Sequence, residues 1–504
     1  MIPNMIKNKD SSIDNIRWIT VVLVVIYHVI YMFNGVQTIG VIGPFSEVQY
    51  QDIYQYIVYP WFMLLLFVIS GMSSRFYLNN HSDKEFIKSR TTKLLVPSTI
   101  GLFVFWWIMG YYNMAISGAL ESMSAVPKPI FFLIMSVSGT GPLWYIQLLW
   151  VFSLILVIIR KIEKDKLYVI CKKVNVPILI ALALVIWEAA QVLYTPIIVV
   201  YRFGIYGAGF LFGYFIFSHD EVMEKLEKWW LVFSFAAVVI GVTFVITFWG
   251  ATYTDHVVLD TFLCNLYSWI ATLAILSFMK KWGNFDNSFS RFMSRKSWGL
   301  YLFHYLPLSI CAWYLHTYTT LPAIAMYICV GIAAFAGAFI LYEIISRIPF
   351  LKWCICGIRG KKMFADNLME LRKYHNMSQE ELAEKIGVSR QTLSKYETGE
   401  SLPDIEKCKT IADVFGVTVD DLICYEKSDG MGLGLPPKGK HIFGMVKVGD
   451  KGQIVIPAKA RKIFNINPGD NLIILGDESQ GIALIKEKGL LELLHSAGSS
   501  MHKH

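Results

Sequence analysis

The sequence predicts a multi-domain protein with three parts: a polytopic all-α membrane bundle, a small all-α domain and a short, mostly β domain. Of 504 residues, 55% are apolar and only 17% are charged, and most Trp and Phe lie in long apolar runs before residue 353. Residues 361–504 carry equal numbers of basic and acidic residues, so the net charge of +8 belongs to the first part. This much apolar surface excludes intrinsic disorder, and eight Cys in such a length exclude a small disulfide scaffold.

Ten apolar runs approach the roughly 20 residues that a helix needs to cross a bilayer. We expect membrane spans at 16–34, 54–76, 94–114, 142–160, 176–193, 196–217, 229–249, 262–279, 297–316 and 321–344. The run 129–137 is too short to span and is expected to be re-entrant or interfacial.

Basic residues alternate between the connecting loops. Lys and Arg are concentrated in 77–93, 160–175 and 280–296. The loops between these have none, in 35–53, 250–261 and 317–320, or only Lys128, in 115–141. By the positive-inside rule both termini are cytoplasmic, and an even number of spans requires the same arrangement.

Two ionisable residues share one face of the first run. His28 follows Arg17 by eleven residues, which returns to nearly the same face about 16 Å deeper. Ionisable residues inside spans are costly and usually functional. A neutral imidazole accepts a proton well, so His28 is a candidate general base, and Arg17 suits a phosphate-bearing group at the inner surface. The alternative is structural: Arg17 snorkels to lipid headgroups and His28 bonds to a neighbouring helix.

Further polar residues lie in later runs. His304, in the ninth run, is a second candidate for orientation or proton relay, with a helix-packing contact as the alternative. Glu188 and Arg202 are expected to form a structural ion pair across a short outer hairpin. Cys354 and Cys356 lack nearby partner ligands, so no metal site is expected.

Several segments, in order along 10–357, resemble the acyltransferase 3 family of integral-membrane acyltransferases. The Arg17-x10-His28 spacing is similar to the signature of that family's first span. The other similar segments are FVISG (67–71), FIKSRTTKLLVP (86–97), GPLWYIQLLW (141–150), SWGLYLFHYLP (297–307) and YEIISRIPFLKWCICG (342–357).

The resemblance implies an enzyme of the bacterial plasma membrane that moves an acyl group, often acetyl, from an acyl-CoA co-substrate to a hydroxyl of a glycan, lipid or small molecule. It implies catalytic roles for His28, Arg17 and His304, with His28 deprotonating the acceptor hydroxyl. It implies that coenzyme A is bound by Arg17, Ser70, Arg90 and Lys93. Lys93 stands where the family more often has Arg, which keeps the charge but weakens bidentate phosphate contacts.

Residues 363–424 read as five short helices. Ser378 and Glu381 form a capping box that opens one helix, and Gly387 ends it at the turn of a helix-turn-helix. The next helix, 389–399, turns Leu393 inward and its polar residues outward.

This spacing resembles the Cro/repressor-type helix-turn-helix of the xenobiotic-response-element (XRE) family. The resemblance implies double-stranded DNA as a partner, because that family's recognition helix enters the major groove. Gln391 would read a base edge and Gln379 would hold a backbone phosphate. The implied contact residues are Gln379, Arg390, Gln391, Thr392, Ser394 and Lys395. The alternative is a helix-turn-helix that contacts only protein.

A Gly- and Pro-rich linker (425–443) leads to residues 444–486, read as strand, strand, short helix, strand, strand, and then a tail, 487–504. DKGQIVIPAKARK (450–462) and the turn PGD (468–470) are similar to the swapped-hairpin AbrB/MazE family. So short a β unit cannot bury a core alone. The resemblance therefore implies a homodimer through 444–486, with DNA contacts from Lys447, Lys451, Lys459, Arg461 and Lys462.

Two hypotheses of different classes follow for the whole chain. In the first, residues 1–357 are a membrane O-acyltransferase that carries a DNA-binding cytoplasmic tail. In the second, the protein is primarily a transcription regulator whose membrane part is a tether or sensor, or two proteins joined by gene fusion. Met363 favours the second, because MFADNLMELRK (363–373) reads like the start of a freestanding regulator. The retained Arg17 and His28 argue against a decayed enzyme.

Overall fold

The computed structural model describes residues 11–36, 40–46, 49–123, 125–193, 200–358, 363–399, 401–424, 446, 448–449, 452–477 and 481–486. The chain forms two compact units, Met1–Gly360 and Lys361–His504, which are the membrane unit and the tail unit below. The predicted fold class is confirmed: a bundle of apolar helices precedes a helix-turn-helix region and a small antiparallel hairpin.

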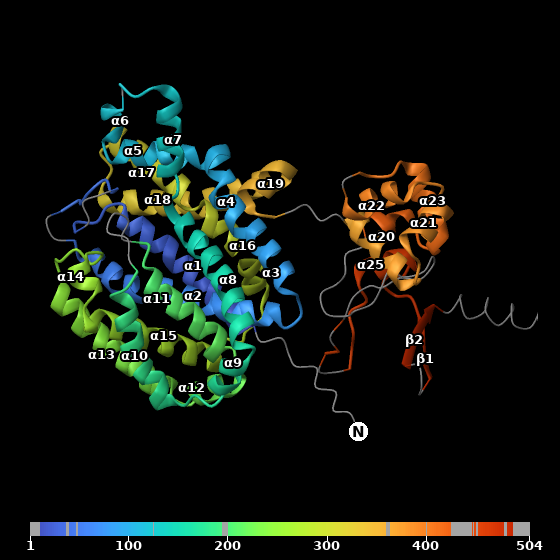
Figure 1. Cartoon of the computed structure of the whole chain (residues 1–504), viewed down its shortest axis with the longest axis horizontal. Helices are drawn as coiled ribbons and strands as arrows, with labels where there is room; N and C mark the ends of the chain where they lie inside the picture. Colours follow the sequence, from blue (N-terminus) through green and yellow to red (C-terminus); the bar gives the residue numbers. More distant parts are fainter. Residues whose placement is uncertain are drawn as a thin grey trace, which may run out of the picture. The chain divides into compact units, whose positions relative to one another are not determined.

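The first half of the membrane unit runs from α1 to α9 (Figure 1). Its elements are α1 (Ser12–Tyr31), η1 (Tyr50–Asp52), α2 (Ile53–Leu78), α3 (Asp83–Arg90), η2 (Thr91–Leu95), α4 (Val96–Ser98), η3 (Leu102–Trp106), α5 (Trp107–Ile116), α6 (Ala119–Ser122), α7 (Lys128–Ser138), η4 (Gly141–Leu143), α8 (Trp144–Glu163) and α9 (Lys166–Cys171). The second half comprises α10 (Val176–Ala190), α11 (Phe203–Phe212), η5 (Gly213–Phe217), α12 (Asp220–Glu227), α13 (Trp230–Phe248), α14 (His256–Leu259), α15 (Phe262–Trp282), α16 (Ser288–Phe303), α17 (Tyr305–Tyr318), α18 (Ala323–Arg347) and α19 (Pro349–Cys356).

Seven helices of the described residues are long and apolar enough to cross a membrane. They are Ser12–Tyr31, Tyr50–Leu78, Asp83–Ile116, Gly141–Glu163, Trp230–Phe248, Phe262–Trp282 and Ala323–Arg347. The predicted fifth and sixth spans are shorter apolar helices, Val176–Ala190 and Phe203–Phe217, and the run predicted as too short to span is the helix Lys128–Ser138.

Helix α2 is the centre of the membrane unit and packs against α1, α11 and α15. The backbones of α2 and α11 come into direct contact where they cross. A glycine on each of the two segments faces the backbone of the other. A Cβ on Gly71 would lie 2.0 Å from the Phe210 carbonyl oxygen, and one on Gly213 would lie 1.9 Å from the Val68 carbonyl oxygen. Small residues let membrane helices approach in this way.

The predicted ninth span is a helix pair, α16 and α17, that breaks at His304. Pro307 explains the break, because it has no N–H to donate to the carbonyl of Phe303. Gly337 of α18 lies against the ring, since a Cβ there would be 2.5 Å from Pro307 Cβ. The break leaves His304 at a helix junction inside the bundle.

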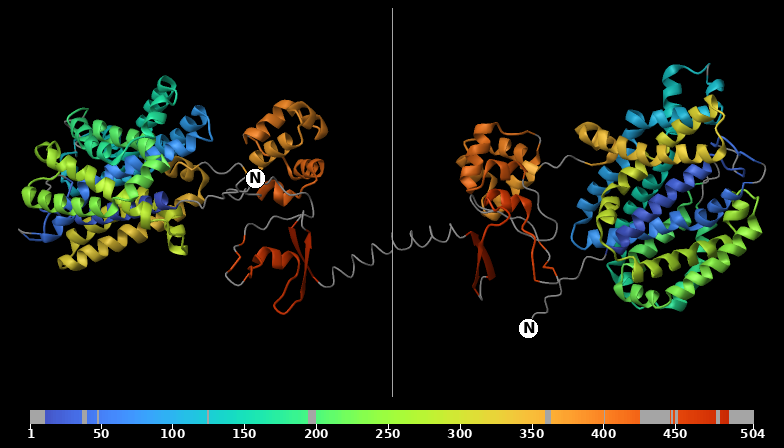
Figure 2. Two further views of the ribbon diagram at one scale, coloured as in Figure 1. Left: turned by 90° about the horizontal axis from the view of Figure 1, so that it is seen from below. Right: turned by 180° about the vertical axis from the view of Figure 1, so that it is seen from behind.

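The tail unit begins with a five-helix group, which both views of Figure 2 show as compact. Its helices are α20 (Met363–Tyr374), α21 (Gln379–Lys385), α22 (Arg390–Thr398), α23 (Ile405–Phe415) and α24 (Val419–Cys424). Leu393 is fully buried, and Gly387 adopts a φ of +65° at the turn, where a side chain would be strained. The predicted capping box is present, and the Ser378 backbone N–H lowers the pKa of the Glu381 carboxyl.

The last part of the tail unit contains α25 (Ala458–Ile463) and a hairpin of β1 (Leu472–Asp477) and β2 (Gly481–Lys486). The hairpin is antiparallel and pairs Ile473 with Ile485. Of the two strands predicted before α25, the second is not seen, because residues 452–457 form no strand, and most of the first lies outside the described residues. A strand needs a partner ladder, and in the expected swapped dimer that ladder comes from a second chain. The predicted linker and terminal tail lie outside the described residues.

Candidate functional site

His28 and His304 meet inside the membrane unit. The His304 Nε2 atom lies 3.1 Å from the His28 Nδ1 atom. His304 is fully buried, and Tyr27 and Tyr305 pack edge-on against the half-buried His28 ring. Two residues that the sequence suggested separately therefore form one hydrogen-bonded pair.

The contacts of this pair assign its tautomers when both rings are neutral. His304 Nδ1 lies 2.8 Å from the Tyr301 carbonyl oxygen and 3.1 Å from that of Leu300, and carbonyls only accept, so His304 Nδ1 carries the proton. Its Nε2 then accepts from the His28 Nδ1–H, which also lies 2.9 Å from the Val24 carbonyl oxygen. The lone pair of the His28 ring is left on Nε2, which is the atom that can take a proton.

Arg17 lies on α1 and points towards the end of α2 that the basic loop follows. Its Nη2 donates to Ser73 Oγ at 2.8 Å, and its Nη1 pairs with Asp14 Oδ1 at 2.9 Å. The Arg17 side chain is 40% exposed, so the guanidinium still reaches solvent or a ligand. Ser73 was missed in the sequence, although it lies three residues after the Ser70 of the family-like Ser-Gly pair.

The other residues expected to bind coenzyme A come from α2, α3 and η2. Ser70 Oγ lies 2.7 Å from the Tyr145 hydroxyl, and Arg90 Nη2 donates to Ser74 Oγ at 3.0 Å. Lys93, in the π-helical turn η2, is close enough to Arg90 for the two charges to repel. The structure therefore gathers the cations and hydroxyls of the predicted donor site around one helix turn, in an arrangement that fits a polyanion.

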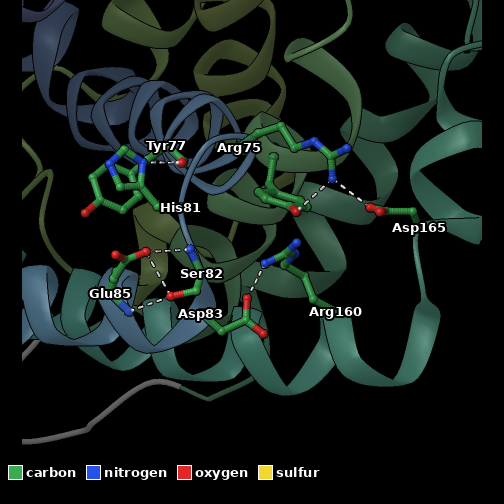
Figure 3. Close-up of polar contacts among 9 residues, drawn as sticks. Arg75, Tyr77, His81, Ser82, Asp83, Glu85, Arg160 and Asp165 are labelled. Carbon is green, nitrogen blue, oxygen red and sulfur yellow. Dashed lines mark hydrogen bonds and ion pairs between the residues drawn. The ribbon is translucent and has the colours of Figure 1, made fainter. Parts of the chain in front are cut away.

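Helix α3, which carries Arg90, is fixed at its start (Figure 3). Ser82 and Glu85 form a reciprocal capping box, and Asp83 pairs with Arg160 of α8. These contacts hold α3 against α8. They position Arg90 without touching the donor site itself.

A second ion pair, between Arg75 and Asp165, lies nearby (Figure 3). Arg75 Nη1 lies 2.7 Å from Asp165 Oδ1 and 3.0 Å from the Tyr214 hydroxyl, and its guanidinium carbon stands 3.6 Å above the Tyr168 ring. This arginine is thus committed to packing and ion pairing, and its side chain is only 13% exposed, compared with 40% for Arg17.

The last helix of the membrane unit, α19, packs against the turn that carries Lys93. Gly357, with a φ of +65°, ends α19, and a Cβ there would lie 2.7 Å from both Lys93 Cα and the Lys93 carbonyl oxygen. Trp298 Nε1 donates to the Cys356 carbonyl at 2.9 Å and anchors the same helix end. The start of the join to the tail unit is therefore in direct contact with the predicted donor site.

Tyrosines pack along α1 and α2 on the other side of His28. The Tyr27 hydroxyl lies 3.1 Å from that of Tyr253, and the Tyr59 ring stacks on Tyr27 at 5.8 Å. Beyond them, Gln55 is fully buried with neither amide atom hydrogen-bonded, and Asp52 Oδ1 is buried and unsatisfied. Buried polar groups without partners are rare in native proteins. Gln55 leaves no signal in the sequence, because its burial depends on packing.

The predicted ion pair of Glu188 and Arg202 is wrong. Arg202 is buried, at 5% exposure, and its Nη2 donates to the Leu259 carbonyl oxygen at 3.2 Å. Glu188 is exposed at the end of α10. Arg202 points inward to Leu259 of α14 instead, so the two charges do not meet.

The described residues contain no group of three or more His, Cys, Asp or Glu that could hold a metal ion. Cys354 and Cys356 are buried free cysteines of α19.

In the tail unit, Gln379 takes part in a buried ion-pair network. Arg372 Nε and Nη2 lie 2.6 and 3.1 Å from the two carboxylate oxygens of Glu397, and Gln379 Nε2 donates to the same carboxylate at 2.7 Å. The amide nitrogen proposed to hold a phosphate is thus already engaged, and it links α21 to α22.

The recognition helix α22 presents the remaining candidates at its surface. Arg390, Gln391 and Lys395 are exposed, whereas Thr392 and Ser394 are half-buried. Arg390 Nε pairs with Glu380 at 2.8 Å, and both side chains are exposed, so this pair can exchange for a phosphate contact.

The basic candidates near α25 are only partly described. Arg461 and Lys462 are exposed on α25. Lys447 and Lys451 lie outside the described residues, as does the side chain of Lys459. The PGD turn is stabilised by Asp470, which accepts from the Asn467 backbone N–H at 2.7 Å.

Comparison with known proteins follows the same division of the chain. Residues 10–343 match the acyltransferase domain family, residues 368–422 match a helix-turn-helix family, and residues 445–491 match the bacterial antitoxin family described as MazE, antidote-toxin recognition. No solved structure matches the chain.

Transcriptional regulators of the helix-turn-helix type are similar to this part of the chain. The HTH-type transcriptional activator BcrR of Enterococcus faecalis is 42% identical over 64 residues, which are 13% of this chain and 31% of BcrR. The uncharacterized HTH-type transcriptional regulator MJ0272 of Methanocaldococcus jannaschii is 41% identical over 64 residues, 13% of this chain and 97% of that protein. The chain thus spans about a third of the length of BcrR and nearly all of MJ0272.

Because the acyltransferase match covers 10–343, the chain belongs to the acyltransferase 3 family of membrane proteins and carries helix-turn-helix and MazE-type domains after its membrane part.

Proposed function

We propose that the protein is an acyl-CoA-dependent membrane O-acyltransferase with a cytoplasmic DNA-binding tail. The observation that carries the enzymatic proposal is the His28–His304 hydrogen bond, because it leaves His28 Nε2 as the free base. Arg17, eleven residues earlier on α1, donates to Ser73 of α2, close to the other proposed donor-site residues Ser70 and Ser74.

The cations support a donor with several negative charges. Arg17 and Arg90 each donate to a neutral serine hydroxyl of α2, and Arg17 also pairs with Asp14. The N–H groups that remain can reach phosphate oxygens. The acyl-CoA phosphates would bind at Arg17, Arg90 and Lys93, and the thioester would extend towards His28. Acetyl is the acyl group that the family resemblance favours.

The acceptor hydroxyl would approach His28 from the side of Tyr27 and Tyr59. His28 Nε2 takes the hydroxyl proton as the oxygen bonds to the thioester carbonyl carbon. The carbon–sulfur bond then breaks, and the thiolate recovers a proton from the imidazolium. His304 keeps the His28 ring in the tautomer that allows this transfer. The unsatisfied Gln55 and Asp52 supply donors and acceptors for the rest of the acceptor.

The tail supports DNA binding as a second activity of the chain. Exposed Arg390, Gln391 and Lys395 suit a major-groove contact by α22. The hairpin leaves large apolar side chains uncovered, including Ile474 at 67% and Ile482 at 78% exposure, which favours a homodimer through 444–486. We place both termini on the cytoplasmic side, as the basic loops require.

The enzymatic proposal is tested in membranes from cells that express the full chain. Radiolabelled acetyl-CoA is supplied, and label in lipid, glycan and small-molecule fractions is measured. His28→Ala should abolish the label, whereas His316→Ala, at an exposed histidine of α17, should not change it. Undiminished labelling by His28→Ala would reject the mechanism.

A further inference from the structure

An apolar groove of about 610 Å³ lies where α13 and α15 pack against α2, away from the histidine pair. Its lining runs along α15 from Tyr267 to Met279 and along α13 from Ser234 to Ile246. Each stretch is about 18 Å of helix. One leaflet accounts for about 15 Å of the hydrocarbon thickness of a bilayer. The groove therefore has the length of a single acyl chain in one leaflet.

Small residues form the floor of this groove. Ala237, Gly241 and Ala274 contribute little side-chain volume, and a Cβ on Gly241 would lie 2.8 Å from the Tyr267 ring. Helix α13 otherwise faces outward, with Val238 and Ile246 at 64% and 75% exposure. An apolar channel on an outward face of a membrane helix pair is filled by hydrocarbon, because no water competes for it.

One end of the groove leads to residues that suit a lipid headgroup. Phe278 and Met279 line that end, and α15 continues directly into Lys281 and Trp282. Lys281 Nζ stands 4.9 Å from the Trp230 ring centre and 5.5 Å from that of Trp282. Trp and Lys are the residues that anchor helices at the headgroup level.

The charge at this end selects the kind of headgroup. Within the residues that the structure describes, Lys281 forms no ion pair with a carboxylate, and its ammonium group makes cation–π contacts with the two indole rings. Lys228 is exposed two residues before the start of α13, next to the half-buried Glu227, so lysine charge exceeds acidic charge here. An ammonium between two indole rings can bind a phosphate without first breaking an ion pair with a carboxylate.

We propose that this groove is a retained site for an anionic phospholipid. One acyl chain lies between α13 and α15 against α2, and the phosphate lies at Lys281 in the leaflet on the side of the basic loops. The site is separate from the proposed acyl transfer and does not depend on it.

The test uses the full chain in nanodiscs that contain phosphatidylcholine and a trace of a photoactivatable lipid. Two probes with a diazirine in the acyl chain are compared, phosphatidylglycerol and phosphatidylcholine. We expect phosphatidylglycerol to label peptides of α13 and α15 about fivefold more than phosphatidylcholine, the preference expected from one lysine near a phosphate. Equal labelling by both probes would mean ordinary annular lipid and overturn the proposal.

Matched variants separate the groove from its surroundings. Val238→Trp fills the groove, whereas Val239→Trp places the same side chain on the neighbouring exposed position outside the lining. Only Val238→Trp should remove the labelling. Lys281→Gln should remove the headgroup preference, and Lys173→Gln, at an exposed lysine of another basic loop, should retain it. If Val239→Trp or Lys173→Gln has the same effect as its partner, the labelling does not report this site.

Discussion

His304 Nε2 lies 3.1 Å from His28 Nδ1, although 276 residues separate the two in sequence. Because His304 Nδ1 is held by two backbone carbonyls, the pair has one arrangement of protons in its neutral form. A histidine near the start of the chain thus receives its tautomer from a helix junction near the end of the membrane unit.

His304→Phe should lower kcat by roughly 100-fold, because loss of the acceptor at Nε2 lets the His28 ring change tautomer and orientation. His28→Ala should cost roughly 10²–10⁴-fold. KM for acyl-CoA should stay near its normal value in both variants. The double variant should be no slower than His28→Ala alone, since His304 acts through His28. Additive losses, measured with labelled acetyl-CoA in membranes, would contradict this positioning role.

Arg90→Ala should raise KM for acyl-CoA by roughly 10-fold or more, the loss expected for a hydrogen bond to a charged group, with little change in kcat. Lys88→Ala is the control, because Lys88 is an exposed cation of the same helix α3. Coenzyme A binding to the purified full chain checks the same point without an acceptor. An unchanged affinity in Arg90→Ala would remove this residue from the donor site.

Gly357→Ala should weaken acyl-CoA binding and lower the melting temperature, because the new methyl group would meet the backbone of Lys93. Gly118→Ala is a matched control: Gly118 has a similar φ of +71°, but no atom lies within 4 Å of its Cβ position. Both variants share the left-handed backbone cost of about 1–2 kcal/mol. The difference between their melting temperatures and acyl-CoA affinities measures the contact alone. Identical values in the two variants would show that α19 does not support the donor site.

Gln55→Leu should stabilise the membrane unit while lowering acyl transfer. The buried amide has no partner in the folded protein, and an apolar side chain of similar size removes a desolvation cost of roughly 1–3 kcal/mol. Thermal unfolding in detergent and labelling in membranes are measured on the same samples. A destabilised variant would mean that Gln55 is satisfied by internal water rather than kept for the acceptor.

The full chain should bind DNA more weakly in anionic bilayers than the isolated residues 363–504 do in solution. The short join at 357–362 keeps the tail close to headgroups whose charge repels DNA, within about 10 Å at ordinary salt. Fluorescence anisotropy is measured with a DNA sequence selected on residues 363–504. Nanodiscs of phosphatidylcholine alone should restore the affinity, and equal affinities in both lipids would contradict the electrostatic explanation.

The sequence by itself determined the features that depend on local periodicity. Apolar run length predicted the membrane helices, and eleven residues of helix placed Arg17 and His28 on one face. The caps and glycine of the helix-turn-helix were also readable, because Ser378, Glu381 and Gly387 act within one or two turns. The family resemblance for 10–357 is confirmed by the match over 10–343.

Only the tertiary structure decided which distant groups meet. It joined His28 to His304, gave Arg17 and Arg90 their serine partners on α2, and turned Arg202 to a carbonyl instead of Glu188. None of these contacts leaves a trace in hydrophobic periodicity, because each depends on how helices cross and rotate against one another. The strand expected at 452–457 is not formed for a similar reason. Its local pattern is correct for a strand, but a ladder also requires a partner strand to accept and donate its hydrogen bonds.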